Sequence, residues 1–215
     1  MSSVLKLVCT VALCAAAAPA STIGIFSTGV DNANAVLPVG AVDTHYTLVS
    51  QPGATVTPGS NPVRYDNAAY TAPGFLNSAF VSPTAAGTAG AVGIYIYQTT
   101  FTIPSGFDPA TATLSGKFAT DNSGFIRLNN GPNLATCGSS CFSVGQTFTI
   151  NGTGFLAGVN TFQIGVNNEG DPTAFRLEFT SATVSASGTV PEPGSLGLLG
   201  LGLAGLGFLA RRRLV

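Results

Sequence analysis

The sequence predicts an all-β fold, a β-sandwich with long loops, for most of this 215-residue chain. Apolar and polar side chains alternate with a period of two in several segments, which is the pattern of half-buried strands. Clusters of Gly, Asn, Asp and Pro separate these segments and are typical of turns. No segment has the apolar period of a three-turn amphipathic helix. Irregular spacing between the segments favours a sandwich over a closed barrel.

Residues 1–20 have the features of a secretory signal peptide. Lys6 supplies one positive charge, an apolar run covers residues 7–18, and the small residues Ala18 and Ala20 stand at positions −3 and −1 of a cleavage site. We therefore expect signal peptidase to cut after Ala20 and to release an exported chain.

Two other interpretations of this first segment remain open. One is a short permanent anchor, although about a dozen apolar residues cannot cross a hydrocarbon core that needs ~20. The other is lipid attachment at Cys14, but Leu13 stands where lipidation sites have a small residue.

The predicted exported domain, residues 21–188, carries little charge. It contains four Lys or Arg residues against eight Asp or Glu residues, which gives a net charge near −4. This balance argues against nucleic acid as a partner, because phosphate contacts need a positive surface. The chain has one histidine, His45, and no G-x-S-x-G elbow accompanies it. We therefore expect a structural histidine, no metal or other cofactor, and no enzymatic activity.

Alternating segments predict the main strands of this domain. Their apolar residues of one parity are Tyr95, Tyr97, Phe101 and Ile103, then Ala112, Leu114 and Phe118, then Phe162, Ile164 and Val166, and finally Phe175, Leu177 and Phe179. Glu178 alternates with the last set, so the pattern predicts a solvent-facing position for its side chain.

The first third of the domain is less regular. Residues 28–41 and 50–90 are rich in Pro, Gly and Ala, which favours long loops that wrap the sheets. Disorder is the alternative, although the isolated aromatic side chains in these segments favour burial. Short strands are expected near residues 23–26 and 46–49.

Polar bends and strands follow a particular order within residues 95–186. A bend containing Asp121 precedes a strand that ends in Asn129-Asn-Gly131, and Gly158-Val-Asn160-Thr opens a later strand. This order resembles galactose-binding-like jelly rolls, the fold of accessory domains in many glycosidases. The resemblance implies a jelly-roll-like sandwich. Because such folds host sugar binding, protein contacts and structural roles, it does not indicate a function by itself.

Polar side chains gather at the predicted loop ends, and Asp121, Arg127 and Asn129 are the candidate ligand contacts among them. Carboxylates and amides suit sugar hydroxyls and Ca²⁺. Tyr95 or Tyr97 would be a reasonable additional contact, since the chain lacks tryptophan. Turn chemistry is nevertheless the favoured interpretation, because Asn and Asp tolerate left-handed backbone and bond to it.

Cys137 and Cys141 are the cysteines that remain after signal cleavage. In an oxidising compartment, their Cys-x-x-x-Cys spacing favours a disulfide that closes a loop tip, with free thiols as the alternative. A zinc site would need two further soft ligands, which a single histidine cannot supply. So small a ring restricts little of the unfolded chain, and its stabilisation should lie at the low end of ~2–4 kcal/mol.

The end of the chain combines a short motif, an apolar run and a basic cluster. In order, they are Pro191, Glu192 and Pro193, then an uncharged run over residues 196–210, then Arg211, Arg212 and Arg213. The run predicts one short transmembrane helix of about 22 Å, against a hydrocarbon core of ~30 Å. The arginines act as a membrane stop and favour a cytoplasmic C-terminus.

This segment, residues 189–215, resembles the PEP-CTERM sorting signal. The resemblance implies a signal peptide, a variable exported body and an exosortase, a membrane-embedded transpeptidase-like enzyme that recognises Pro191, Glu192 and Pro193 and removes the helix and the arginines. It also implies transient residence in the inner membrane before the body reaches the cell surface or the medium. An ordinary single-pass anchor with a proline-rich stalk is the alternative.

These features together predict an exported bacterial cell-surface or matrix protein with an adhesion or structural role. The sorting resemblance further implies an association with biofilm, and exopolysaccharide is a candidate partner. A carbohydrate-binding module is the alternative function. A secreted hydrolase using Asp121 or Glu178 is a weaker one, because the composition offers few titratable groups to converge on a cleft.

Overall fold

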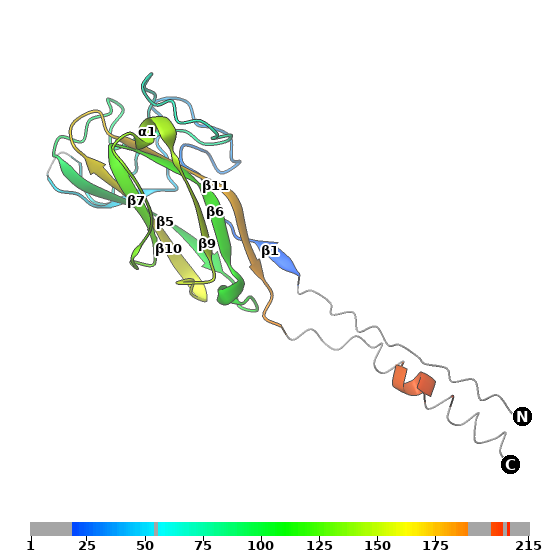
Figure 1. The fold of residues 1–215 in the computed structure, drawn as a ribbon. Coiled ribbons are helices and arrows are strands. Elements are labelled where there is room, and N and C mark those ends of the chain that lie inside the picture. The colour runs from blue at the N-terminus through cyan, green and yellow to red at the C-terminus, as the bar shows by residue number, and fades with distance from the viewer. Residues whose placement is uncertain (1–18, 54–55, 189–198, 204–205, 207–215) are drawn as a thin grey trace, which may run out of the picture. The chain divides into compact units, whose positions relative to one another are not determined.

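Two antiparallel sheets pack face to face in the computed structural model, which describes residues 19–53, 56–188, 199–203 and 206 (Figure 1). Sheet A has the order β3 (Val63–Arg64), β4 (Val81–Ser82), β11 (Ala174–Ser185), β6 (Thr113–Asp121) and β9 (Gln146–Asn151), and β1 (Ala20–Thr22) also pairs with β11. Sheet B has the order β2 (Thr47–Ser50), β5 (Gly93–Ile103), β10 (Gly158–Asn168), β7 (Ser123–Leu128) and β8 (Asn133–Cys137). The prediction of an all-β sandwich is confirmed.

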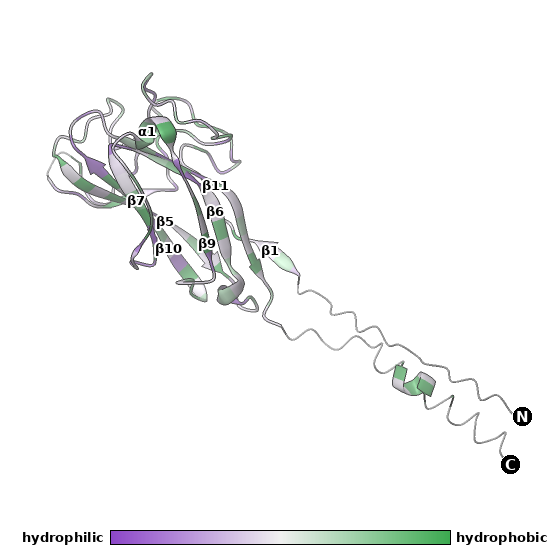
Figure 2. Ribbon diagram, viewed as in Figure 1, coloured by the Kyte–Doolittle hydropathy of each residue, from purple (hydrophilic) through white to green (hydrophobic). Residues whose placement is uncertain are grey.

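The core lies between the two sheets and is built from the alternating residues of the long strands. Tyr97 on β5 packs against Phe175 on β11, with ring centroids 4.4 Å apart, and Phe148 on β9 meets Phe162 on β10 at 5.8 Å. Figure 2 shows the corresponding change between hydrophobic and hydrophilic residues along the strands. Because strand side chains alternate between faces, one parity of each strand fills this core.

The first and last strands of the sandwich lie side by side. Ala20 pairs with Ser185 and Thr22 with Thr183 at one end of sheet A, which we call the terminal pole. The opposite end of the same sheet begins where Ala174 pairs with Asp121, and we call it the loop pole. Figure 1 shows long loops and the short helix α1 (Cys141–Val144) gathered at the end remote from β1.

Loops of the first third cover the outer face of sheet A at the loop pole. Phe80 and Ala72 from these loops form a second, smaller apolar cluster with Ala119 of β6 and Ala174 of β11. Burial of apolar groups against the sheet orders these segments, so the described residues of 50–90 form packed loops. The expected short strand near residues 46–49 is present as β2. The one expected near residues 23–26 is instead β1, three residues earlier.

The structure contradicts two expectations about individual side chains. Glu178 is 4% exposed, because loop residues cover the outer face of sheet A around it. Tyr95 and Tyr97 are core residues, 1% and 2% exposed, so neither is available to a ligand. Alternation therefore predicts these strands correctly, but it does not predict which side chains are exposed to solvent.

Residues Ala20–Ala186 form one compact unit. Several sequence predictions fall outside the described residues: Ala18 of the cleavage site, the tripeptide Pro191, Glu192 and Pro193, and the cluster Arg211, Arg212 and Arg213. Residues 199–203 are helical. Among the described residues, no helix is both long enough and apolar enough to cross a bilayer.

Candidate functional site

The three predicted ligand contacts do not lie together. Asp121 ends β6 at the loop pole and belongs to sheet A, whereas Asn129 follows the other end of β7 in sheet B. Arg127 lies between them on the outer side of β7, where its Nε donates to Oε1 of Gln163 at 2.5 Å. A strand of six residues spans ~20 Å, so one small ligand could not contact both ends.

Asn129 serves the backbone of a turn. Its φ of 51° is in the left-handed region, which Asn tolerates better than most residues. Its Nδ2 donates to the carbonyl of Gly154 and to Oδ1 of Asn160, both at 2.8 Å, and its Oδ1 accepts from the backbone N–H of Thr161 at 2.7 Å. The turn interpretation therefore accounts for this side chain.

Asp121 is a buried carboxylate with a partner from a distant loop. It is 6% exposed, and its Oδ2 accepts a hydrogen bond from the hydroxyl of Tyr70 at 2.9 Å. Burial raises the pKa of Asp121 above its ordinary value, and the bond from Tyr70 acts in the opposite direction. Burial also raises the pKa of Tyr70, and the bond to Asp121 raises it further. This pair ties the loop to the end of sheet A.

A hollow with several polar side chains lies on the outer side of sheet A. It has a volume of about 400 Å³. Its lining comes from β3 and the loop after it, from the segment before β4, and from β11: Arg64, Tyr65, Asp66, Asn67, Tyr70, Ser78, Phe80 and Arg176. We call it the arginine hollow. The sequence did not reveal it, because its lining comes from four separate segments, with Val36 of the loop before β2 as the fourth, and matches no short motif.

Both guanidinium groups of the arginine hollow are held in place. Arg176 donates from Nε to the hydroxyl of Ser78 at 2.8 Å and from Nη2 to the carbonyl of Ser78 at 2.6 Å. Arg64 donates from Nη1 to the carbonyl of Leu37, and its Nη2 lies 3.2 Å from the carboxylate of Asp66. Burial lowers the pKa of Arg176 from its ordinary value, yet guanidinium groups stay protonated in proteins.

Glu178 anchors the loop that supplies Ser78 to this hollow. Its carboxylate accepts from the backbone N–H of Leu76 at 2.9 Å, from the N–H of Asn77 at 2.7 Å and from the hydroxyl of Ser78 at 2.8 Å. Several bonds to an ionised carboxylate satisfy its buried charge. In the sequence, the signal for this role is a single acidic residue within an apolar strand. Alternation alone predicts that its side chain faces solvent, and so it does not identify the anchor.

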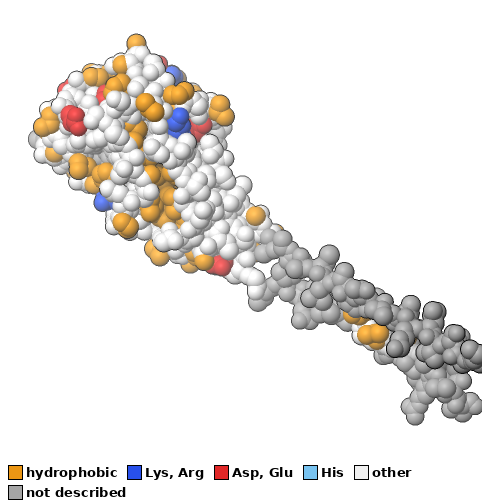
Figure 3. Space-filling model, in the orientation of Figure 1, with side chains coloured by type: hydrophobic (Ala, Val, Ile, Leu, Met, Phe, Trp, Pro, Cys, Tyr) orange, Lys and Arg blue, Asp and Glu red, His pale blue; other side chains and the backbone are white. Residues whose placement is uncertain are grey.

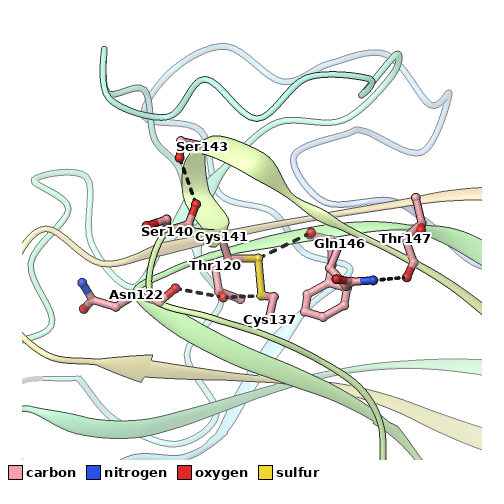
Figure 4. Close-up of a disulfide and its surroundings, with 9 residues drawn as sticks. Thr120, Asn122, Cys137, Ser140, Cys141, Ser143, Gln146 and Thr147 are labelled. Carbon is pink, nitrogen blue, oxygen red and sulfur yellow. Dashed lines mark hydrogen bonds between the residues drawn. A yellow bond between two sulfur atoms is a disulfide. The ribbon is translucent and has the colours of Figure 1, made fainter.

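A disulfide joins Cys137, at the end of β8, to Cys141, at the start of α1 (Figure 4). Their Cα atoms are 5.7 Å apart, within the usual range for disulfides. The hydroxyl of Thr120 lies 3.2 Å from Sγ of Cys137 and 3.2 Å from the carbonyl of Asn122. The bridge therefore fastens the β8–α1 loop against β6 at the loop pole.

His45 packs closely among its neighbours. Its ring stacks on Phe26 with centroids 3.9 Å apart, its Nδ1 lies 3.3 Å from Asp43, and its Nε2 lies 3.0 Å from Oδ1 of Asn32. Asp43 is completely buried and also accepts from the backbone N–H of Gly29 at 2.7 Å. Burial raises the pKa of Asp43, although these hydrogen bonds act against the rise. The cluster fastens the loop between β1 and β2.

The C-terminal segment of the chain is similar to a known sorting signal. The PEP-CTERM protein-sorting motif matches residues 189–213, and this motif implies an exported protein that an exosortase sorts from a C-terminal membrane anchor. No curated protein matches the chain.

Several solved structures have a similar arrangement of strands. The Stig cyclase Fisc from Fischerella sp. TAU is 16% identical, with 77% of this chain and 100% of that chain covered and a TM-score of 0.41. A CBM35 from Cellvibrio japonicus Abf62 is 21% identical, with 69% and 97% covered and a TM-score of 0.31. A family 35 carbohydrate-binding module from an environmental isolate is 16% identical, with 69% and 98% covered and a TM-score of 0.31. Similarity at this level carries no inference about activity or ligand.

Proposed function

We propose that this protein is a non-enzymatic component of the bacterial cell surface or extracellular matrix, with an adhesion or structural role in biofilm. The observation that carries the proposal is the position of the sorting motif next to a finished domain. The last strand, β11, ends at Ser185, Ala186 forms a single bridge with Phe107, and the motif begins at residue 189. Removal of the tail would therefore leave every strand of the sandwich intact.

Signal cleavage after Ala20 is also compatible with the fold. It would remove one residue of β1 but leave Ser21 paired with Val184 and Thr22 paired with Thr183. The next residue, Ile23, is 5% exposed and donates its N–H to the carbonyl of Ala182 at 2.8 Å. The mature N-terminus would thus stay fixed to β11, as expected for a domain made to survive processing.

The pairing of β1 with β11 brings the two ends of the sandwich together. Ala20 and Ser185 are direct neighbours at the terminal pole, so the chain leads from one pole to both predicted processing sites. Arg176 lies nine residue steps before Ser185 on β11, which at ~3.3 Å per residue is about 30 Å. The arginine hollow is therefore remote from the strand ends that processing would affect.

The surface supports a matrix role more than a catalytic one. Figure 3 shows few charged side chains on the visible face, among many uncharged polar and scattered hydrophobic ones. The buried carboxylates of Asp43, Asp121 and Glu178 all accept hydrogen bonds from loops or neighbouring residues. Such pairing stabilises loops and leaves these groups unsuited to general acid or base catalysis, which needs contact with a substrate.

Carbohydrate binding is the second candidate function, and the arginine hollow favours it. The hollow combines cations, amide groups and aromatic rings at about 400 Å³, a volume within the usual range of small-ligand sites. The residues first expected to bind sugar, Asp121, Arg127 and Asn129, are dispersed over the sandwich and do not support a common site.

Cell fractionation with a variant of the motif tests the proposed destination. In the native host, the wild-type body should accumulate at the cell surface or in the matrix, and Glu192→Ala should accumulate in the inner membrane, because exosortase would no longer recognise it. Glu169→Ala, which changes an exposed carboxylate of the body, should fractionate like wild type. Identical fractionation of wild type and Glu192→Ala, or unchanged biofilm mass after deletion of the gene, would count against the proposal.

A further inference from the structure

We infer that the arginine hollow binds the carboxylate of an acidic sugar, such as a uronic acid residue of an anionic exopolysaccharide. The inference deepens the proposed function and rests on it for the matrix setting. It names a site, a ligand class and the residues that select it. The supporting observations are the distribution of charge, the fixed guanidinium groups, a weak internal carboxylate contact and the aromatic walls.

Positive charge is concentrated on this side of the sandwich. Of the four basic residues in the exported domain, Arg64, Lys117 and Arg176 all lie on sheet A or its loops. The ring of Phe75 lies 4.4 Å from the guanidinium carbon of Arg176 and 5.4 Å from Nζ of Lys117. In a body with a net charge near −4, three of the four cations are thus placed on one sheet, and Asp66 and Glu178 only partly offset them.

The guanidinium groups retain donors for a ligand. An arginine has five N–H donors, and the hydrogen bonds of Arg176 use its Nε and Nη2 only. Within the part of the chain that the structure describes, no hydrogen bond engages its Nη1, so this group can still donate to a ligand. The contact with Ser78 fixes the plane of the group, so less side-chain entropy is lost on binding. A planar, fixed guanidinium matches a carboxylate in a bidentate manner, which an ammonium group cannot do.

Asp66 already places a carboxylate against Arg64. Its oxygen lies 3.2 Å from Nη2 of Arg64, and its side chain is 60% exposed. An ion pair this exposed contributes little, about 0–1 kcal/mol. A ligand carboxylate held by further contacts can therefore take its place. Asp66 acts as an internal competitor in this scheme, and its removal should strengthen binding of an acidic ligand.

The walls of the hollow suit a sugar ring. Tyr65 and Tyr70 meet edge to face at 5.8 Å, and Tyr70 packs on Phe80 at 4.6 Å. Aromatic rings offer apolar faces to the C–H side of a sugar, while the amide of Asn67 is suited to its hydroxyls. These contacts distinguish a sugar acid from a small inorganic anion.

Binding measurements on the full chain, purified in detergent, test this inference. The probes are trimers of galacturonic acid and glucuronic acid, with a galactose trimer as the neutral control. At low salt, the wild type should bind an acidic trimer at least tenfold more tightly than the neutral one, and added salt should weaken the binding. Arg64→Gln should reduce acidic-trimer affinity at least tenfold, whereas Arg127→Gln, on the other sheet, should leave it unchanged.

The variant Asp66→Asn keeps the test decisive if Arg64→Gln unfolds. It should raise acidic-trimer affinity severalfold, because it removes the competing carboxylate but keeps a side chain of the same shape. No binding of either acidic trimer, equal binding of the neutral trimer, or weaker binding by Asp66→Asn would overturn the inference. Such a failure would leave the fractionation results untouched, so it is distinguishable from a failure of the proposed function.

Discussion

At the residue scale, buried carboxylates determine how the loops attach to the sandwich. Glu178 holds the segment of residues 76–78, Asp121 holds Tyr70, and Asp43 holds Gly29. Glu178 and Asp121 each join a loop of the first third to a distant strand, and Asp43 joins two parts of the loop between β1 and β2. The period-two pattern correctly places Glu178 on the outer face of β11. The exposure of its side chain depends on the loops that cover this face, and a local sequence pattern does not predict where those loops lie.

Replacement of Glu178 by Gln should lower the free energy of unfolding by about 2–4 kcal/mol, since an NH₂ group would then face backbone N–H donors and leave them unsatisfied. Urea unfolding provides the measurement. Glu169→Gln, a change at an exposed carboxylate, should stay within ~0.5 kcal/mol of wild type. Equal effects of the two substitutions would show that the Glu178 contacts do not stabilise the loop.

The pKa values of Asp43 and Asp121 are both raised, chiefly by burial. A carboxyl group whose pKa is higher in the folded than in the unfolded chain stabilises the fold below its unfolded value, ~3.9. That contribution is lost as the pH rises through the folded-state value. Asp121→Asn keeps an acceptor for the Tyr70 hydroxyl and removes the ionisation.

We therefore expect the free energy of unfolding to fall less steeply with rising pH above about pH 4 in Asp121→Asn than in wild type. Urea unfolding at several pH values checks this. Asp31→Asn, at an exposed position, controls for the loss of one charge. A slope unchanged by Asp121→Asn would mean that the carboxyl ionises as freely in the folded chain as in the unfolded one.

At the element scale, the long strands were predictable and the two shortest, β3 and β4, were not. β5, β10 and β11 each have at least 11 residues, so alternation and flanking turns identify them. β3 and β4 have two residues each, and these strands exist only because they pair with each other and with β11. The edges of sheet A are thus set by tertiary contacts.

Strands β9 and β11 approach β6 so closely at Gly116 that any larger side chain there would clash. A Cβ on Gly116 would lie 2.0 Å from the carbonyl oxygen of Glu178 and 2.8 Å from the ring of Phe148. Backbone cannot move aside cheaply, so Gly116→Ala should destabilise the fold by about 1–3 kcal/mol. Gly24→Ala meets no atom within 4 Å and should be nearly neutral in thermal unfolding. A neutral Gly116→Ala would contradict the packing described for this pair of strands.

The disulfide between β8 and α1 closes a short ring, so chain-entropy arguments give it about 2 kcal/mol. The double substitution Cys137→Ser with Cys141→Ser should lower the free energy of unfolding by roughly that amount, and dithiothreitol should have a similar effect on wild type but none on the double variant. The spacing of Cys137 and Cys141 and the expected oxidising compartment were sufficient to predict this bridge from the sequence. Sensitivity of the double variant to dithiothreitol would show that the reductant acts elsewhere.

At the scale of the whole molecule, sequence reasoning succeeded where information is local. The sandwich follows from strand periodicity, and the sorting motif follows from contiguous residues at the end of the chain. The arginine hollow depends on Arg64, from β3, and Arg176, from β11, meeting across sheet A. Such a site becomes visible only when the fold brings distant segments together.

Both ends of the sandwich meet at the terminal pole, and the hollow lies toward the other end of β11. The hollow is therefore separate from the strand ends that lead to the predicted processing sites.

Intact mass of the protein recovered from its native host addresses the processing directly. The mature form should begin at Ser21 and lack the segment that contains Arg211, Arg212 and Arg213, with its new C-terminus at or near Pro191, Glu192 and Pro193. A strain without exosortase should yield only chains that retain Val215. If every molecule from the wild-type host still ended at Val215, the tail would be a permanent anchor and the sorting account would be wrong.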